Sequence, residues 1–383
     1  MRADAPLRLL MLTDTAILGA GGSERFLRNL LNRLPAEKYA VDVLQLSGPP
    51  GEGQRIGELD GNPIRLAYRP VEAIYAPRGL AAFNFVRRRV LAGDYDIVQS
   101  QHEKSDLINA CLPQVAGVRR ISNRRDQGFQ KSRRVRVVFR RANRRFDRIV
   151  APSRSIVNAL VADENADGKR CLAIPNGVDT ERFRPRAEAE RATLRAALGF
   201  GVSECLIGCV ASFSPVKQHA ILVDAFARVH RQFPQARLLL VGQGPLRGQI
   251  EAQLHAIGIA QAVHLLGARR DVEQILPALD IFALASSTEG MSNAILEAQA
   301  SGVAVVATGV GGNVEVIHDG SNGLLVPPLS AEALAQGLST LVADRTLRSD
   351  LAASALRGIA RDHSLTAMTK AYERLYDELA DER

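Results

Sequence analysis

Two glutamates separated by seven residues, Glu289 and Glu297, form the most chemically informative pair in the chain. They follow an apolar run, 281–284, and the segment between them predicts a helix with Ser292 or Asn293 as its N-cap. Backbone N–H groups in a first helical turn attract an anion, and nearby carboxylates can accept hydrogen bonds from sugar or ribose hydroxyls. The alternative is that both glutamates only complement the helix dipole. The ligand-binding residues expected here are Glu289, Gly290, Met291, Ser292, Asn293 and Glu297.

A lysine and two glycines are candidates for binding phosphate. Lys217 lies in a loop after the apolar run 206–211, where a cation could neutralise a diphosphate. Gly21 and Gly22 lie in the loop 13–24, where glycines let backbone N–H groups approach a phosphate at the start of a helix. This loop matches neither Gly-x-Gly-x-x-Gly nor a P-loop. The alternatives are a solvated lysine and a plain strand-to-helix turn.

His102 follows a predicted strand, 96–100, within two residues. Ligands of parallel sheets bind at the carboxyl ends of strands, although a single histidine is more often structural. We find no Asp-x-Asp in a loop that could hold a divalent cation, no His/Cys cluster and no Gly-x-Ser-x-Gly. Without a metal, a diphosphate leaving group needs lysine, arginine, helix ends and backbone amides. We therefore expect neither a metal nor a cofactor.

The stretch Glu289–Glu297 resembles the signature of the retaining family 4 glycosyltransferases, also called group 1 glycosyltransferases, which have the GT-B fold. Gly21-Gly22-Ser23-Glu24-Arg25 is similar to the glycine loop of that family, and Pro175-Asn176-Gly177-Val178-Asp179 is similar to another of its segments. Further similar segments are 214–217, 241–245 and 319–323. In this order and spacing the segments are specific to the family, and they span nearly the whole chain.

The resemblance implies a nucleoside diphosphate sugar as donor, bound mainly by the second half, and an acceptor bound by the first. Lys217 would contact the diphosphate and Glu297 the ribose, while Glu289 would meet the transferred sugar. His102 matches the family histidine that hydrogen-bonds the donor sugar, so His102, Lys217 and Glu289 are the expected catalytic residues. In this family retention is ascribed to a front-face displacement in which the leaving phosphate helps to deprotonate the acceptor.

One position departs from the family pattern. An arginine often stands five residues before the phosphate-binding lysine, and this chain has Ser212 there. The expected pair of cations is therefore incomplete, unless another arginine supplies the second charge. The candidates are Arg124, Arg125, Arg269 and Arg270.

Short β-rich apolar runs alternate with longer helical patterns, which predicts an α/β fold with parallel sheets. The expected architecture is GT-B, with two Rossmann-like, doubly wound domains facing a central cleft. We predict an N-terminal acceptor-binding domain at 1–185, completed by a C-terminal helix at 365–383, and a nucleotide-sugar-binding domain at 186–364. The charged segment 179–204 is the expected linker. Strands are expected at 7–12, 41–46, 96–100, 148–153, 206–211, 237–241, 262–266, 281–284 and 303–307, and helices at 24–34, 219–232, 246–257 and 293–301.

Composition favours a folded cytoplasmic protein. A chain of 383 residues, 46% of them hydrophobic, is long enough for two domains. Its four cysteines show no metal-binding spacing and indicate reduced thiols. The N-terminal apolar run 7–13 is too short for a signal peptide, and no apolar stretch approaches the roughly 20 residues that span a bilayer.

Positive charge is concentrated in the first half. Residues 1–185 contain 32 basic and 20 acidic side chains, a net +12, whereas the remainder is −4, which together give the +8 of the chain. The segment 131–145 interleaves valines and a phenylalanine with arginines, as an amphipathic helix would. It could bind anionic lipid headgroups beside a lipid-linked acceptor, hold an acidic glycan or the donor phosphates, or form only a solvated face. The acceptor- or membrane-facing candidates are Arg124, Arg125, Arg133, Arg134, Arg140 and Arg141.

The function predicted from these observations is a retaining, metal-independent hexosyltransferase of cell-surface polysaccharide or lipopolysaccharide synthesis. Its partners would be a nucleotide sugar, a glycan or lipid-linked acceptor, and the inner face of the plasma membrane, where it would bind peripherally. One alternative is a sugar-nucleotide 2-epimerase of the same fold. Another is a basic nucleic-acid-binding protein, which is disfavoured by the absence of tryptophan, the scarcity of aromatic residues and the lack of a recognition motif.

Overall fold

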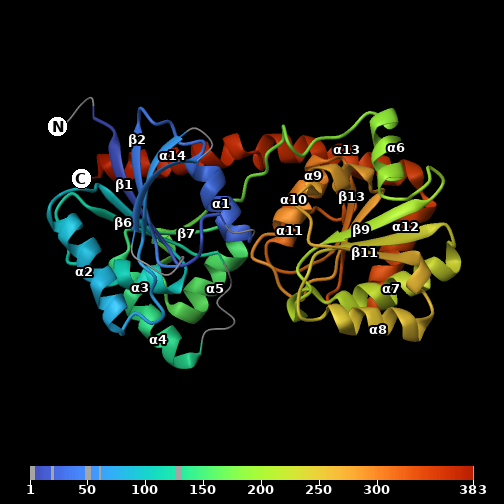
Figure 1. Cartoon of the computed structure of the whole chain (residues 1–383), viewed down its shortest axis with the longest axis horizontal. Helices are drawn as coiled ribbons and strands as arrows, with labels where there is room; N and C mark the ends of the chain where they lie inside the picture. The colour runs from blue at the N-terminus through green and yellow to red at the C-terminus, as the bar shows by residue number, and fades with distance from the viewer. Residues whose placement is uncertain (1–4, 19–20, 48–52, 60–61, 126–131, 383) are drawn as a thin grey trace. The chain divides into compact units, whose positions relative to one another are not determined.

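The chain folds into two compact units, shown in Figure 1. Unit 1 comprises Met1–Asn176 with Leu365–Arg383, and unit 2 comprises Gly177–Ser364. The computed structural model describes residues 5–18, 21–47, 53–59, 62–125 and 132–382, with the backbone alone at 53–59 and 62–64. Each unit is described by itself below.

The boundary between the two units was predicted after residue 185, whereas in the structure it lies nine residues earlier, after Asn176. The backbone N–H of Val178 donates to the carbonyl of His363, and the side chain of Phe183 is buried in the core of unit 2. The expected linker therefore belongs to unit 2, where it forms helix α6 (Glu188–Ala197). Arg195 of this helix is buried and forms an ion pair with Asp280 at 3.0 Å.

Unit 1 is built on a sheet whose described strands follow the order β3-β4-β2-β1-β5-β6-β7-β8. All neighbouring strands are parallel except β3, which is antiparallel to β4. The strands are β1 (Leu7–Thr13), β2 (Tyr39–Gln45), β3 (Gly53–Leu59), β4 (Asn62–Tyr68), β5 (Ile97–Gln101), β6 (Arg119–Asn123), β7 (Arg148–Ala151) and β8 (Cys171–Ala173). The helices are α1 (Gly22–Leu31), α2 (Pro77–Leu91), α3 (Glu103–Cys111), α4 (Arg133–Ala142), α5 (Arg154–Glu164) and α14 (Leu365–Asp381).

Helix α14 returns from the end of the chain to complete unit 1. It packs with α1 on one face of the sheet, where Tyr372 and Tyr376 are fully buried. The hydroxyl of Tyr376 donates to Gln99 at 2.9 Å, and the amide of Asn123 donates to the hydroxyl of Tyr372 at 2.9 Å. Helix α2 lies against the opposite face of the sheet. Because each buried aromatic side chain removes about 150–250 Å² from water, α14 is a large part of this core.

Unit 2 is a parallel sheet with the strand order β11-β10-β9-β12-β13-β14. Its strands are β9 (Cys205–Val210), β10 (Ala236–Val241), β11 (Val263–Gly267), β12 (Ile281–Leu284), β13 (Ala304–Thr308) and β14 (Leu324–Val326). Its helices, besides α6, are α7 (His219–Gln232), α8 (Arg247–Ile257), α9 (Val272–Ile275), α10 (Asn293–Ala300), α11 (Asn313–Val316), α12 (Ala331–Ala343) and α13 (Arg345–Asp362). The five strands predicted in this half are confirmed to within one residue at each end.

The four cysteines are free thiols. Among the helices that the structure describes, none has both the length and the apolar character needed to cross a membrane.

Helix α7 begins at His219, whose side chain is 1% exposed and packs edge-on against Phe213 with ring centroids 4.8 Å apart. Burial, with a smaller repulsion from Lys217, lowers the pKa of His219 to about 4. The imidazole is therefore neutral in the folded unit at neutral pH.

His219 should make unit 2 sensitive to acid. Between its ordinary pKa of about 6.5 and the lowered value, the unfolded chain binds the proton more readily than the folded chain does. The free energy of unfolding should therefore fall as the pH is lowered through this range, by about 3 kcal/mol in total from this group. His219→Phe should show a smaller loss than wild type in urea unfolding between pH 7 and pH 4. His255→Asn, at an exposed histidine, is the control, and equal pH slopes for His219→Phe and wild type would contradict the prediction.

Candidate functional site

Lys217 and Glu289 form an ion pair between two loops at the carboxyl end of the unit 2 sheet. Lys217 follows β9 and Glu289 follows β12, and the distance from Nζ to Oε1 is 2.5 Å. Ser286 Oγ donates to the same carboxylate oxygen at 2.7 Å. The lysine side chain is 22% exposed and the glutamate side chain 10% exposed. The site thus presents a cation and a carboxylate at adjacent positions, partly shielded from water.

Backbone contacts hold three loops of this edge together. The N–H of Ser287 donates to the carbonyl of Val216 at 2.8 Å, and Thr308 Oγ1 donates to the carbonyl of Ser286 at 2.6 Å. The N–H of Gly312 donates to the carbonyl of Glu289 at 3.3 Å. A β-carbon at position 312 would lie 2.2 Å from the carbonyl oxygen of Gly290, so glycine is required there. These contacts fix the loops after β9, β12 and β13 against one another.

Helix α10 begins directly after this loop and supplies the remaining expected residues of unit 2. Ser292 is its N-cap, with Oγ accepting from the N–H of Ile295 at 3.4 Å, and Asn293 is its first residue. Met291 and Glu297 are 8% and 6% exposed, so both side chains are largely buried. Helix α10 therefore begins shortly after Glu289, and its N-terminal end carries the partial positive charge of the helix dipole.

Burial keeps a neighbouring thiol neutral. Cys209 on β9 is fully buried, and burial raises its pKa to about 12, although the nearby charge of Lys217 works in the opposite direction. Cys209 is therefore protonated at neutral pH and does not compete with Glu289 for the lysine.

The arginine expected at position 212 has no evident replacement among the candidates in unit 2. Ser212 is exposed, and its hydroxyl lies 3.2 Å from that of Ser214. Arg269 donates to both carboxylate oxygens of Asp271, at 2.8 and 2.5 Å. Arg270 is exposed, and its carbonyl accepts from Arg182. Within the described residues, no hydrogen bond or ion pair joins Arg269 or Arg270 to Lys217.

In unit 1, His102 stands at the carboxyl end of β5, immediately before α3. Its φ of 76° is unusual for a residue other than glycine and shows that the surroundings hold this turn in place. The carboxylate of Asp14, after β1, accepts from the N–H groups of Lys104 at 2.7 Å and Ser105 at 2.8 Å. Asp14 therefore positions the start of α3 beside His102.

Gly21 is the N-cap of α1, and Gly22 is the first residue of that helix. A β-carbon at Gly21 would lie 2.2 Å from the carboxylate of Glu24, a flexible side chain that could shift. The preceding residues of this loop, 19 and 20, lie outside the described residues.

Two residues that help to build these sites were not singled out from the sequence, namely Ser286 and Asp14. Each is a polar residue directly after a buried strand, and that position was the signal that could have identified them.

Arg124 was expected to face the acceptor or the membrane, and the structure shows that this expectation was wrong. It is 4% exposed and forms ion pairs with Asp106 at 2.9 Å and Glu164 at 3.4 Å, so it belongs to the interior of unit 1. Arg125 stacks on Phe26, with 3.7 Å to the ring centroid, and donates to Asn176 at 2.5 Å. Burial lowers the pKa of Arg125 to about 10, which still leaves it charged at neutral pH.

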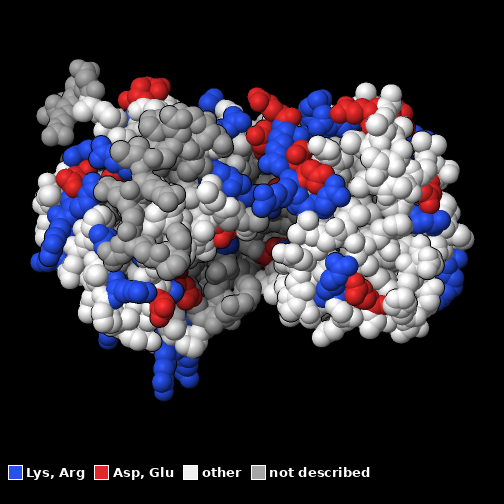
Figure 2. Space-filling model, in the orientation of Figure 1, with Lys and Arg blue, Asp and Glu red and all other residues white. Residues whose placement is uncertain are grey.

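Within the predicted amphipathic segment 131–145, α4 covers Arg133–Ala142 and a 3-10 turn follows at Asn143–Arg145, while residue 131 lies outside the described residues. Phe139 anchors α4 in the core, whereas Val137 and Val138 are 48% and 49% exposed. Figure 2 shows basic side chains projecting from unit 1 in the region of α4. The exposed arginines of this helix include Arg133, Arg134, Arg140 and Arg141.

The chain does contain an Asp-x-Asp sequence, Asp94-Tyr95-Asp96, although none was expected in a loop that could hold a divalent cation. It lies at the amino end of β5, where Asp94 pairs with Arg89 at 2.9 Å and Asp96 pairs with Arg8 at 3.4 Å. Within the described part of the chain, no group of three or more His, Cys, Asp or Glu side chains is arranged to hold a metal ion.

Comparison with known proteins places this arrangement in a family. A model of Glycosyltransferase Family 4 matches residues 20–182, and a model of Glycosyl transferases group 1 matches residues 204–344. The D-inositol 3-phosphate glycosyltransferase of Corynebacterium urealyticum is 27% identical over 94% of this chain and 91% of its own length. A GDP-mannose-dependent alpha-(1-6)-phosphatidylinositol monomannoside mannosyltransferase of Mycolicibacterium smegmatis is 27% identical over 88% of this chain and 89% of that protein.

The structure is also similar to that of HepE from Anabaena, solved in complex with UDP and glucose. The TM-score is 0.81 at 21% sequence identity, over 97% of this chain and 100% of that chain. Both units thus have the architecture expected from the sequence. With one family model matching each half of the chain and relatives that match along most of their length, the chain belongs to the group 1, or family 4, glycosyltransferases of the GT-B fold.

Proposed function

We propose that this glycosyltransferase moves a sugar from a nucleoside diphosphate sugar to a glycan or lipid-linked acceptor, with retention of configuration and without a metal. The observation that carries the proposal is the cluster of Lys217, Glu289 and Ser286 beside the first turn of α10. A lysine and a helix N-terminus complement a diphosphate, and a carboxylate complements sugar hydroxyls. The matched families are glycosyltransferases, which favours transfer over 2-epimerisation and over nucleic-acid binding.

Unit 2 is the proposed donor-binding unit. Lys217 would contact the diphosphate, Glu297 the ribose hydroxyls, and Glu289 with the backbone of Gly290 and Met291 the transferred sugar. The complex of HepE with UDP and glucose supports a nucleotide sugar as the ligand class. The ion pair with Glu289 keeps the ammonium group of Lys217 in place before the donor binds, which reduces the ordering cost of binding.

Retention is proposed to follow a front-face displacement. The bond from the anomeric carbon to the leaving phosphate breaks through an oxocarbenium-like state, and the acceptor oxygen attacks from the same face. The leaving phosphate takes the acceptor proton, so no protein nucleophile is needed. Lys217 and the helix end stabilise the charge that develops on the diphosphate. His102, held by the turn before α3, is the proposed catalytic side chain of unit 1.

Unit 1 is the proposed acceptor-binding unit, and α4 is its proposed membrane-facing element. Four exposed arginines flank two half-exposed valines on this helix, a combination suited to the interface of an anionic leaflet. The enzyme would then act at the inner face of the plasma membrane in the synthesis of a surface glycan.

Metal independence is the first test. Transfer should continue in EDTA with at most a small loss of rate, since lysine and backbone amides stabilise the leaving diphosphate. The measurement is release of nucleoside diphosphate with and without chelator. Loss of activity in EDTA that magnesium or manganese restores would overturn the leaving-group account.

Lys217→Ala and Glu297→Gln should weaken donor binding and slow turnover while the protein remains folded. Removing a charge-assisted contact to phosphate or ribose typically costs about 1.5–3 kcal/mol. The measurement is a thermal-shift and calorimetric titration with UDP, GDP and ADP and their sugars, combined with steady-state rates. Lys370→Ala, at an exposed lysine of α14, is the matched control. Wild-type donor affinity and rate in both variants would show that the two residues only stabilise the loop and helix.

Neutralising Arg133, Arg134, Arg140 and Arg141 together should weaken salt-sensitive binding to anionic liposomes and leave donor affinity unchanged. Each arginine near an anionic surface contributes on the order of 1 kcal/mol, and salt screens this attraction. Liposome co-sedimentation at low and high salt measures the effect. The control neutralises four exposed arginines of unit 2, Arg228, Arg231, Arg345 and Arg357. If wild type does not sediment at low salt, the membrane assignment fails.

A further inference from the structure

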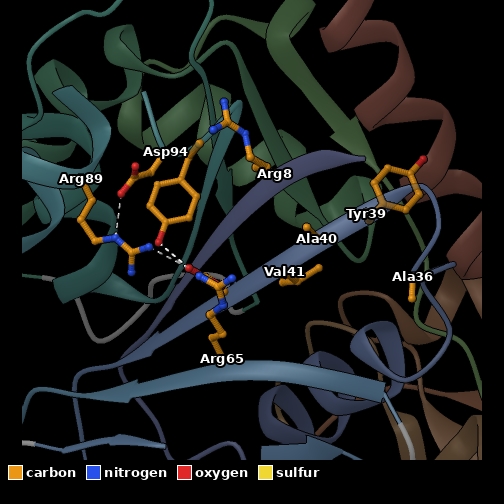
Figure 3. A pocket seen from close by; sticks show the side chains of 10 residues that line it. Arg8, Ala36, Tyr39, Ala40, Val41, Arg65, Arg89 and Asp94 are labelled. Atoms are coloured by element: carbon orange, nitrogen blue, oxygen red, sulfur yellow. Dashed lines mark hydrogen bonds and ion pairs between the residues drawn. The ribbon is translucent and has the colours of Figure 1, made fainter. Parts of the chain in front are cut away.

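A pocket with a volume of about 460 Å³ lies in unit 1 at the amino ends of β1 and β2 (Figure 3). His102 and Gly21 follow the carboxyl ends of strands in the same sheet, so the pocket is separate from the candidate residues described above. Its size falls within the range of small-molecule sites. Nothing in the proposed reaction uses it.

Strand register places two arginines of this pocket on the same face of the sheet. Arg8 on β1 is opposite Ala40 on β2, and Arg65 on β4 is opposite Asp42, two residues further along β2. Because registered residues of parallel strands point to the same face and side chains alternate along a strand, all four share one face of the sheet. Strands β1 and β4 flank β2, so the backbones of the two arginines are about 10 Å apart across the sheet.

The floor between these arginines is open because Ala40 is small and exposed. Elsewhere the same face is covered by the core that Leu10 and Leu44 form with α2. In Figure 3 Arg8 and Arg65 extend from the two strands that flank the strand of Ala40. The single methyl group of Ala40 thus leaves open the space that a ligand would occupy.

The acidic groups of the pocket are neutralised mainly by other residues. The carboxylate of Asp42 accepts from the hydroxyl of Tyr95 at 2.7 Å and from Arg89 at 3.2 Å. Arg89 also donates to Asp94 at 2.9 Å. Burial and the hydrogen bond to Asp42 raise the pKa of Tyr95, which therefore remains a neutral donor.

The two flanking arginines are held less tightly than Arg89. Arg65 lies 3.9 Å from Asp42, longer than a hydrogen bond, and its side chain is 64% exposed. Two nitrogens of the Arg8 guanidinium group lie 3.4 Å from the carboxylate of Asp96. The shorter contact of this carboxylate, at 2.8 Å, is with the backbone N–H of Arg8. Both guanidinium groups can therefore turn toward a ligand without breaking a short ion pair.

We propose that this pocket binds a phosphorylated small molecule or headgroup, with its phosphate between Arg8 and Arg65 and its remainder over Ala36 and Ala40. Guanidinium groups match the geometry of phosphate oxygens and bind them bidentately. The pocket is larger than one phosphate, and the small apolar side chains of its floor suit a short organic portion. The site is independent of the donor site of unit 2, so it stands whether or not the proposed transfer reaction is correct.

The test is calorimetric titration of the full chain with inorganic phosphate, alongside co-sedimentation with vesicles of phosphatidylglycerol and phosphatidylcholine. The double variant Arg8→Gln and Arg65→Gln should weaken binding about ten- to hundredfold. Ala40→Phe should weaken it by occupying the pocket while leaving every charge in place.

The matched control is Arg87→Gln with Arg88→Gln, at two exposed residues of α2, and it should bind as wild type does. Melting temperatures identify any variant that fails to fold. If the double variant does not fold, the binding measured for Ala40→Phe tests the proposal in its place.

The two arms distinguish the source of the phosphate. Binding of inorganic phosphate that survives Lys217→Ala but is lost in Ala40→Phe supports a soluble ligand at this pocket. Vesicle binding that Ala40→Phe removes, without binding of inorganic phosphate, supports a lipid headgroup. If the pocket variants match wild type in both arms, or if phosphate binding depends on Lys217 alone, the proposal is overturned.

Discussion

Parallel strand pairing within each unit is the constraint on which the position of every candidate residue depends. When neighbouring strands run the same way, all of the loops that follow them leave from one edge of the sheet. In unit 2 the loops after β9, β12 and β13 therefore meet, although Lys217, Glu289 and Gly312 are far apart in the sequence. The ion pair and the shared hydrogen bonds then hold these loops in one arrangement. The same constraint places His102 and Asp14 together in unit 1.

The sequence predicted unit 2 better than unit 1, for physical reasons that particular strands make clear. Strands such as β12 are short runs of apolar residues buried on both faces, and such a run can be recognised as a strand from the sequence alone. Strand β6 begins with two arginines and buries Ser122 and Asn123, so it lacks the apolar run from which the other strands were predicted. Its polar groups are satisfied by partners distant in sequence, such as Asp147 for the backbone of Arg120 and Tyr372 for Asn123. Partners of this kind are not visible in the local pattern. The residues of the Glu289–Glu297 segment could be named from the sequence, but the contact of Ser286 with Glu289 required the fold.

Net charge proved a coarse guide to the surface of unit 1. Arg120 and Arg124 are buried, and Arg145 donates to the carbonyls of Ala110 and Leu112. The guanidinium groups of Arg120 and Arg124 therefore belong to the interior of unit 1. The arginines of α4 and those around Ala40 remain at the surface, in two separate places. The positive charge of this half of the sequence is thus divided between buried structural arginines and exposed ones.

The return of α14 to unit 1 has a consequence for biosynthesis. A ribosome completes all of unit 2 before it adds the helix that carries Tyr372 and Tyr376, so the sheet of unit 1 must wait with one apolar face uncovered. Unit 2 is contiguous in the chain and can fold while that face is still open. We therefore expect unit 1 to complete its fold after unit 2, although most of unit 1 is synthesised first. Until release, the nascent chain exposes the surface around Phe26 and Leu30, which is where a chaperone would be expected to bind.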